Sequence, residues 1–310
     1  MNTRIPQMSD LSPIPFVYFG SSRLSVIVLD ELLRLGYKPT LIVTTTDKPQ
    51  GRKLIVTPNV VKTWAVEHNI QVLSPAKLDS EFIAPLVIGN WSLFIVASYG
   101  KIIPTSIIEL PKFKTLNIHP SLLPQYRGAS PLPTAILEDT KKTGVSIMQL
   151  DAEMDHGPVI VQKEINIADH FKEWPTYEDF EEFMAKQGAL LLADVLPDWV
   201  AGKITPHEQD HSKATYTKKI TKEDGLIDFN VEELKNLTKI SPDRAYRLFR
   251  KIQAFHEWPQ AYFFIEKDDA KIRIKITNAS FEHNKLTIDT VIPEGKKEMS
   301  YNDFIRGYIQ

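Results

Sequence analysis

Short apolar runs alternate with amphipathic stretches through the first 120 residues of the chain. The run 16–19 precedes Gly-Ser-Ser and a helical pattern that ends at Gly36, a residue suited to the left-handed position after a helix. The strands are apolar throughout instead of alternating, which is typical of strands buried on both faces. Strands that alternate with helices in this way predict an α/β fold with a doubly wound, mostly parallel sheet. Further strands are predicted at 41–43, 93–97 and 115–118, and helices opening at 57–59 and near 105–110.

The pattern changes in the second half of the chain. A long helix is predicted over 179–200, and the polar segment after it is typical of a linker. Residues 231–255 are mostly helical with a break at Ser241-Pro242, and short strand patterns follow. These strand patterns predict a small β-barrel at 261–265, 272–276 and 286–288. We therefore expect a first domain over 14–201, a linker over 202–217 and a C-terminal domain over 218–310.

The composition excludes several classes of protein. The 310 residues include no cysteine, which excludes disulfides, iron–sulfur clusters, cysteine nucleophiles and thiolate zinc sites. No apolar run approaches the roughly 20 residues that cross a bilayer, and residues 1–13 lack an apolar signal-peptide core, so we expect a soluble, intracellular protein. The formal net charge of −2 argues against a strongly basic nucleic-acid coat. Residues 213–310 nevertheless carry eighteen Lys and Arg against fifteen Asp and Glu, the sign expected of a part that meets phosphates.

Polar side chains that follow predicted strands form the candidate site. Asn117 and His119 are two residues apart at the end of one strand, so they point to the same face. A second strand pattern is followed by the acidic turn that contains Asp155, which we expect at the carboxyl end of a strand in the same sheet. An amide and an imidazole can stabilise an oxyanion while a carboxylate manages protons, which suits acyl-type transfer to an amine. Taken singly, each residue has an ordinary structural alternative, as a strand cap, a structural histidine or a solvated turn residue.

The run from Asn117 to Gly128, Asn-Ile-His-Pro-Ser-Leu-Leu-Pro-Gln-Tyr-Arg-Gly, together with Asp155, resembles the folate-dependent formyltransferases. The wider resemblance is to the methionyl-tRNA formyltransferase family and extends from about residue 16 to the C-terminus. The additional motifs that carry it are Asp47-Lys-Pro-Gln-Gly-Arg52, Ala97-Ser-Tyr-Gly100, Gly128-Ala-Ser-Pro131, Thr143 to Gln149 and Trp258-Pro259.

The resemblance implies a Rossmann-like formyltransferase domain followed by an OB-like β-barrel that binds tRNA. It implies transfer of the formyl group of 10-formyltetrahydrofolate to the α-amine of methionyl-initiator tRNA in translation initiation, in a bacterial cytoplasm or an organellar matrix. Asn117 Nδ2 and a protonated His119 would donate hydrogen bonds to the formyl oxygen. Asp155 would support His119 electrostatically and accept the amine proton, with no metal required. The implied folate-binding loop consists of Ser121, Leu122, Leu123 and Pro124.

Two basic segments are the candidate tRNA contacts under the same resemblance. Lys48, Arg52 and Lys53 lie in a loop that would meet the end of the acceptor stem. This loop departs from the usual family form, because no further glycine and basic residues follow Lys53. Arg247 and Lys251 are four apart on a predicted helix, so they share a face and would form a second phosphate contact. Both segments are also compatible with an ordinary solvated surface.

The role of Arg127 stays open between binding an anion and bracing its loop, and His156 is assigned no role. A formyltransferase that acts on a nucleotide-linked amino sugar would keep Asn117, His119 and Asp155 but would need neither the basic loop nor the C-terminal domain. A non-catalytic RNA-binding protein on this scaffold would not need the intact set. We expect a monomer that binds methionyl-initiator tRNA and the folate and associates with no membrane.

Overall fold

The computed structural model describes residues 14–50, 55–267 and 270–309. The chain divides into two compact units, and the last stretch of the second begins at the end of the predicted linker. The two shorter stretches of the second unit lie inside the predicted first domain, 14–201. The units therefore do not coincide with the predicted domains, and the domain boundaries stay a prediction. Unit 1 comprises Met1–Ala129, Gly144–Ile165 and Glu182–Tyr216, and unit 2 comprises Ser130–Thr143, Asn166–Glu181 and Thr217–Gln310.

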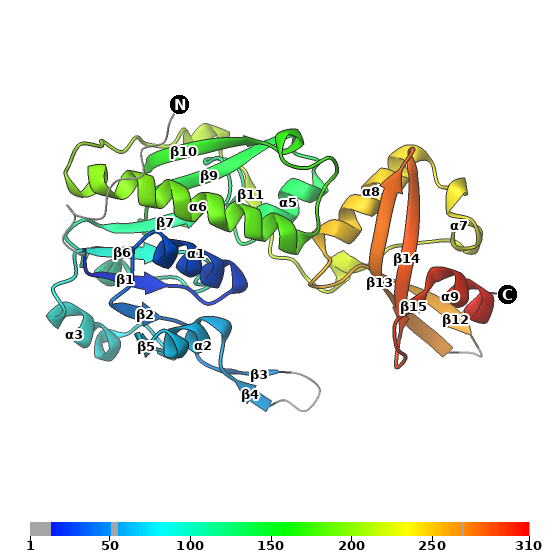
Figure 1. Ribbon diagram of the computed structural model, residues 1–310, viewed down its shortest axis with the longest axis horizontal. Helices are drawn as coiled ribbons and strands as arrows, with labels where there is room; N and C mark the ends of the chain where they lie inside the picture. Colours follow the sequence, from blue (N-terminus) through cyan, green and yellow to red (C-terminus); the bar gives the residue numbers. More distant parts are fainter. Residues whose placement is uncertain (1–13, 51–54, 268–269, 310) are drawn as a thin grey trace. The chain divides into compact units, whose positions relative to one another are not determined.

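Unit 1 is built on a seven-stranded sheet in the order β10-β9-β7-β6-β1-β2-β5. The neighbours from β5 to β7 pair in parallel, and β9 pairs antiparallel with β7. This confirms the mostly parallel, Rossmann-like fold (Figure 1). The strand bounds are β1 Phe16–Phe19, β2 Leu41–Val43, β5 Gln71–Leu73, β6 Leu93–Val96, β7 Thr115–His119, β9 Lys142–Gln149 and β10 Val159–Asn166.

The first two helices of unit 1 begin at residues whose side chains cap them. Ser22 accepts a hydrogen bond from the backbone of Ser25, and Asn59 accepts one from Lys62, which satisfies N–H groups that the helix itself leaves free. Gly36 follows the first helix at φ 88°, as its sequence position predicts. None of the helices in the described parts of the chain is long and apolar enough to cross a membrane. The helices are α1 Arg23–Arg34, α2 Val60–Glu67, α3 Ser80–Ile88 and α4 Thr105–Ile108, together with α6 Tyr177–Val200, which begins in unit 2 and continues in unit 1. The short elements are β3 Lys48–Gln50, β4 Ile55–Thr57, β8 Arg127–Gly128, β11 Tyr216–Thr217 and η2 His211–Lys213, while η1 Ile167–Asp169 belongs to unit 2.

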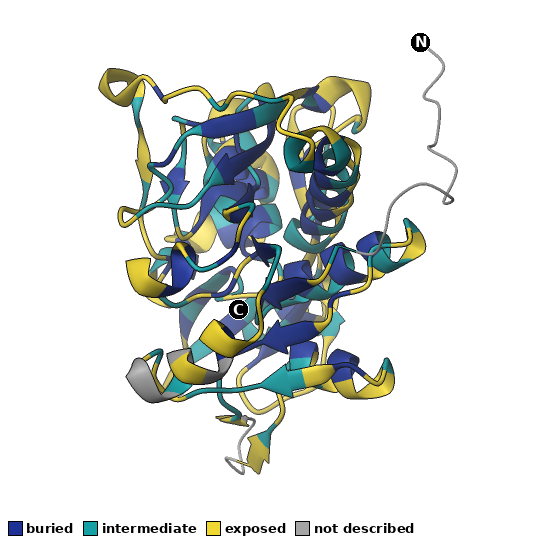
Figure 2. Ribbon diagram, turned by 90° about the vertical axis from the view of Figure 1, so that its left-hand side faces the viewer, coloured by how far each residue is buried: buried dark blue, intermediate teal, exposed yellow. Residues whose placement is uncertain are grey.

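Helix α6 fixes which way the residues of β7 point. A Cβ atom on Gly188 of α6 would lie 2.5 Å from Cγ2 of Ile118, so the absence of a side chain lets the helix approach the strand. Ile118 therefore faces α6, and alternation along the strand points Asn117 and His119 to the opposite face. The same face carries an apolar core that includes Val96, the neighbour of Asn117 in the sheet. Figure 2 shows the strands of the sheet as buried and the exposed residues mainly in loops and on outer helix faces.

Unit 2 contains a four-stranded antiparallel sheet in the order β12-β13-β14-β15. The register between β13 and β14 shifts near Asn278, which bends a long strand, and Leu226 adds a bridge beside β12. This sheet bears out the prediction of a barrel-like C-terminal region, although β13 is much longer than predicted. The elements are β12 Tyr262–Lys267, β13 Ala270–Glu282, β14 Lys285–Pro293, β15 Met299–Ser300, α5 Pro131–Leu137, α7 Val231–Lys235, α8 Pro242–Ala254, α9 Tyr301–Tyr308, η3 Glu223–Gly225 and η4 Leu237–Lys239.

Candidate active site

Asn117 and His119 are two residues apart at the carboxyl end of β7, so their side chains lie on the same face of the strand. Both are buried, at 7% and 4% exposure. Nε2 of His119 donates to the carbonyl oxygen of Tyr126 at 3.0 Å, because a carbonyl can only accept. That contact fixes the imidazole ring and leaves Nδ1 pointing at another group.

Asp155 is the group that Nδ1 of His119 meets. Its Oδ1 lies 3.6 Å from Nδ1 of His119 and 3.5 Å from Nδ2 of Asn117. Its Oδ2 accepts a hydrogen bond from the backbone N–H of Gly128 at 2.7 Å. The structure therefore brings together the amide, the imidazole and the carboxylate that the sequence singled out.

The route by which Asp155 reaches the other two residues corrects the sequence prediction. We expected Asp155 near His119 because both follow the carboxyl ends of strands in one sheet. Strand β9 runs antiparallel to β7, with Gln149 opposite Leu116, so its carboxyl end lies beside the amino end of β7. Residues 150–158 must therefore fold back along the sheet to bring the carboxylate to His119. The reason for the error is that an apolar strand pattern carries no information on strand direction.

The turn that carries Asp155 is held tightly. Asp155 itself has φ 50°, in the left-handed region that few residues other than glycine adopt. The N–H of Gln149 donates to the carbonyl of Pro158 at 2.9 Å and closes the turn. A Cβ atom on Gly157 would lie 2.1 Å from the carbonyl oxygen of Gln149, so this close approach requires glycine. The carboxylate thus stands on a backbone that has little room to move.

The four predicted folate-binding residues differ in where their side chains lie. Ser121 is buried and donates from Oγ to the carbonyl of Gln125 at 2.6 Å, and Leu123 packs in a small core with Met148 and Val159. Leu122 and Pro124 are partly exposed. Of the four side chains, these two are the ones open to a ligand, while the other two shape the loop.

Arg127 braces its loop. Arg127 is 1% exposed, and its guanidinium donates to Oε1 of Gln209, to Nδ1 of His211 and to the hydroxyl of Tyr216. All of these partners come from the segment that follows α6, which was predicted as a linker. The structure therefore favours the bracing role over anion binding. His156, which had no predicted role, stacks on His211 with ring centroids 4.0 Å apart.

The candidate tRNA contacts are only partly described. Lys48 is exposed on the β3–β4 hairpin, whereas Arg52 and Lys53 lie outside the described residues. On α8, Arg247 is exposed. The ammonium of Lys251 donates to the carbonyl of Leu226 at 2.6 Å, and burial lowers the pKa of this lysine. Of the two helix residues, Arg247 is therefore the one whose charge faces solvent.

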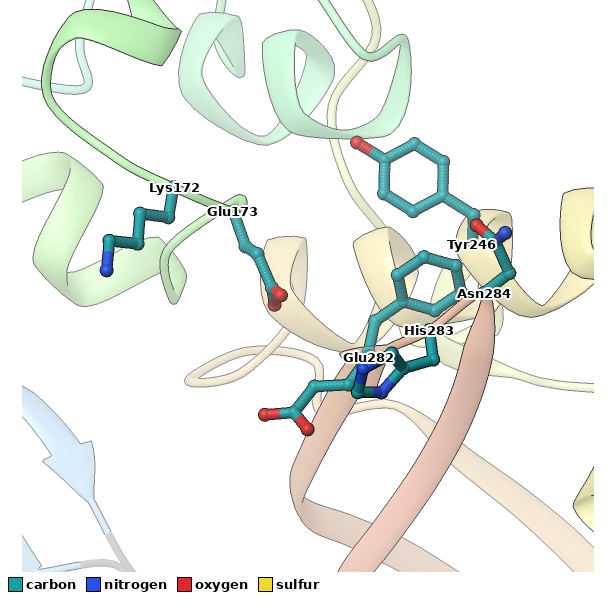
Figure 3. Close-up of a pocket in the computed structure, with 7 residues that line it drawn as sticks. Lys172, Glu173, Tyr246, Glu282, His283 and Asn284 are labelled. Atoms are coloured by element: carbon teal, nitrogen blue, oxygen red, sulfur yellow. The ribbon is translucent and has the colours of Figure 1, made fainter.

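A cavity of about 470 Å³ lies within unit 2 (Figure 3). The catalytic candidates belong to unit 1, so this cavity is a separate feature. Its wall mixes two aromatic rings with charges of both signs, and we assign it no function. Within the described ranges, no three His, Asp or Glu side chains are placed to hold a metal ion. The residues lining the cavity are Lys172, Glu173, Tyr246, Phe281, Glu282, His283 and Asn284.

The sequence prediction missed the residues that support the site. Thr215 pairs with the loop before Arg127, since its N–H donates to the carbonyl of Pro124 and its carbonyl accepts from the N–H of Arg127. Gln209 is buried at 6% exposure and contacts the Asp155 turn. Both stand in a polar segment with no apolar periodicity, so the pattern gave no signal for their packing.

Comparison with known proteins defines the class to which this site belongs. The sequence profile of the formyl transferase family, described as "Formyl transferase", matches residues 16–196. The chain is 33% identical to methionyl-tRNA formyltransferase of Geobacillus sp. (strain WCH70), over 95% of this chain and 94% of the relative. It is 36% identical to methionyl-tRNA formyltransferase of Sulfurihydrogenibium sp. (strain YO3AOP1), over 83% of this chain and 78% of the relative. The chain therefore belongs to the formyl transferase family, among the methionyl-tRNA formyltransferases.

Solved structures share the fold at lower identity. A 4-N formyltransferase from Francisella tularensis has a TM-score of 0.59 and 19% identity, covering 84% of this chain and 96% of the other. Methionyl-tRNA formyltransferase from Clostridium thermocellum has a TM-score of 0.56 and 16% identity, covering 90% and 98%. These similarities extend the shared fold across most of the chain.

Proposed function

We propose that this protein transfers the formyl group of 10-formyltetrahydrofolate to the α-amine of methionyl-initiator tRNA. The observation that carries the proposal is the meeting of Asn117, His119 and Asp155 within 3.6 Å in a chain that matches methionyl-tRNA formyltransferases over nearly its whole length. The folate is a co-substrate that supplies an activated formyl group. The chain's own residues must then stabilise negative charge on the formyl oxygen and remove a proton from the attacking amine.

Asn117 is the first donor to the formyl oxygen. Its Nδ2 carries two hydrogens, and the contact to Asp155 at 3.5 Å uses at most one of them. His119 is the second donor. When the substrate binds, one of its N–H groups leaves its present partner, the carbonyl of Tyr126 or the carboxylate of Asp155, and donates to the formyl oxygen instead. Hydrogen bonds of this kind commonly tighten only in the complex with substrate.

Asp155 accepts the proton of the amine as the new C–N bond forms. The bond between the formyl carbon and N10 of the folate then breaks, and the proton passes to N10 of the departing tetrahydrofolate. One carboxylate oxygen is occupied by the N–H of Gly128, which orients the group. The other oxygen faces Asn117 and His119, where it would accept the proton from the amine of a substrate that those two residues hold. The partly exposed Leu122 and Pro124 would flank the flat pterin, supported by the buried Ser121 and Leu123.

The tRNA would be bound by basic residues that are not part of the catalytic set. Arg247 is exposed and suited to a phosphate, whereas Lys251 is engaged with a backbone carbonyl. Lys48 on the β3–β4 hairpin is a second exposed candidate, and Arg52 and Lys53 are proposed on sequence grounds alone.

The proposal is tested by offering the purified chain 10-formyltetrahydrofolate with either charged initiator tRNA or a nucleotide-linked amino sugar. We expect formylmethionine on the tRNA, detected by mass spectrometry after hydrolysis of the ester, and no formylated sugar. Formylation of the sugar alone would replace the proposed substrate. Binding of tRNA with no formyl transfer would favour a non-catalytic protein.

A further inference from the structure

Gln209 joins the two segments that carry the proposed active site. Its Oε1 accepts from Nε and Nη2 of Arg127 at 3.2 and 2.7 Å. Its Nε2 donates to the carbonyl oxygens of Asp155 and Gly157 at 2.9 and 2.7 Å. One buried side-chain amide thus uses both hydrogens and its oxygen between the loop 120–128 and the turn 150–158.

The partners of Gln209 determine the orientation of its amide. A guanidinium only donates and a backbone carbonyl only accepts, so Oε1 must face Arg127 and Nε2 must face the turn. Glutamate has the same length and shape but offers no donor. Its second carboxylate oxygen would face two carbonyl oxygens in a buried place, which is unfavourable.

The two segments that Gln209 joins meet again at the reacting groups. The carbonyl of Tyr126 accepts from Nε2 of His119, and the N–H of Gly128 donates to Asp155. Both are direct neighbours in sequence of Arg127, which Gln209 holds. The amide therefore constrains the backbone of Asp155 on one side and the backbone that orients His119 on the other.

We infer that Gln209 is a positioning residue for formyl transfer, which sets the distance between Asp155 and His119 without touching either substrate. The inference rests on the proposed function. The hydrogen bonds of Gln209 go to Arg127 and to the turn 150–158, and not to Leu122 or Pro124, the two folate-loop side chains open to a ligand. We therefore expect its loss to act on kcat and to leave the KM values for both substrates close to those of the wild type.

The test compares Gln209→Glu with the wild type in formylation of methionyl-initiator tRNA. A displacement of the order of 1 Å is enough to lower the rate about 100-fold, so we expect kcat to fall roughly 10- to 100-fold. Both KM values should change by less than about 3-fold. Gln71→Glu is the matched control, since Gln71 is exposed on β5, and it should keep wild-type kcat.

Gln209→Met keeps the length of the side chain and removes every hydrogen bond, and it should reproduce the loss of kcat if the charge of glutamate prevents folding. Unchanged kcat in a folded variant would overturn the inference, and so would a loss confined to KM. Failure of both variants to fold, measured by circular dichroism, would also overturn it and make Gln209 purely structural. Absence of formyl transfer in the wild type would instead refute the proposed function, so the two failures are distinct.

Discussion

A single methyl group at Gly157 should displace the carboxylate of Asp155 without altering any reacting group. The added Cβ would lie 2.1 Å from the carbonyl oxygen of Gln149. Contacts between carbon and oxygen settle at about 3.3 Å or more, so the turn must open by about 1 Å. The carbonyl oxygen belongs to the backbone and the Cβ atom is fixed rigidly to it, so no flexible side chain can absorb the change. Asp155 is two residues away and must move with the turn.

The expected size of the effect follows from that displacement. A shift of about 1 Å in a positioned group can lower the rate about 100-fold, equivalent to about 2.7 kcal/mol in the barrier. Overpacking of this kind also destabilises a fold by about 1–3 kcal/mol. We therefore expect Gly157→Ala to fold with a lower Tm, to bind the folate and to show a kcat reduced about 100-fold.

The assay is formylation of methionyl-initiator tRNA at saturating substrates, with thermal unfolding measured on the same samples. Gly307→Ala is the control, because a Cβ there meets nothing within 4 Å and alanine favours a helix, so kcat and Tm should be unchanged or slightly raised. Gly225→Ala collides with the carbonyl of Gln260 at 2.3 Å in unit 2, so it should lower Tm while leaving kcat intact. A folded Gly157→Ala variant with normal kcat would refute the reasoning.

Three further predictions concern single side chains. His119→Ala should lower kcat about 10²–10³-fold through loss of a transition-state donor, and a near-normal kcat would remove it from the mechanism. Arg247→Ala should raise the KM for tRNA and reduce the salt slope by about one phosphate contact, whereas Lys251→Met should change stability more than tRNA affinity; equal effects on affinity would contradict this. The hydrogen bond with Glu178 raises the pKa of His256 above 6.5, so its stabilising effect is complete below that value and is lost as pH rises through the raised pKa. Urea unfolding should then show His256→Gln less stable than the wild type at pH 5.5 and similar to it at high pH, and a pH-independent difference would count against the ion pair.

The sequence predicted the sheet of unit 1 where burial leaves a simple pattern. Strands such as Phe16–Phe19 are buried at every position, and Gly36 ends the first helix with a positive φ. The β3–β4 hairpin, β5 and α3 were not predicted. Strand β5 has only three residues, none of them fully buried, and the hairpin displays exposed Ile55 and Val56, so neither follows the pattern of a core element.

The sequence singled out the three side chains that lie together in the candidate site, but not the way in which the fold brings them together. Asn117 and His119 follow from alternation at a strand end, which is local information. The position of Asp155 depends on the antiparallel direction of β9 and on a nine-residue turn, which depend on contacts distant in sequence. The role of Gln209 depends on a polar segment folding against that turn, and hydrogen bonds between distant polar groups leave no periodicity in a sequence.

We propose that Asp155 works with Asn117 and His119 to move a formyl group to methionyl-tRNA. The most direct measurement is the single-turnover rate of formylmethionyl-tRNA formation by the wild type and by Asp155→Asn at saturating enzyme, where substrate binding does not limit the rate. We predict rapid formylation by the wild type and a rate at least about 100-fold lower for a folded Asp155→Asn variant, which lacks the proton acceptor. Equal single-turnover rates for the two proteins would contradict the account.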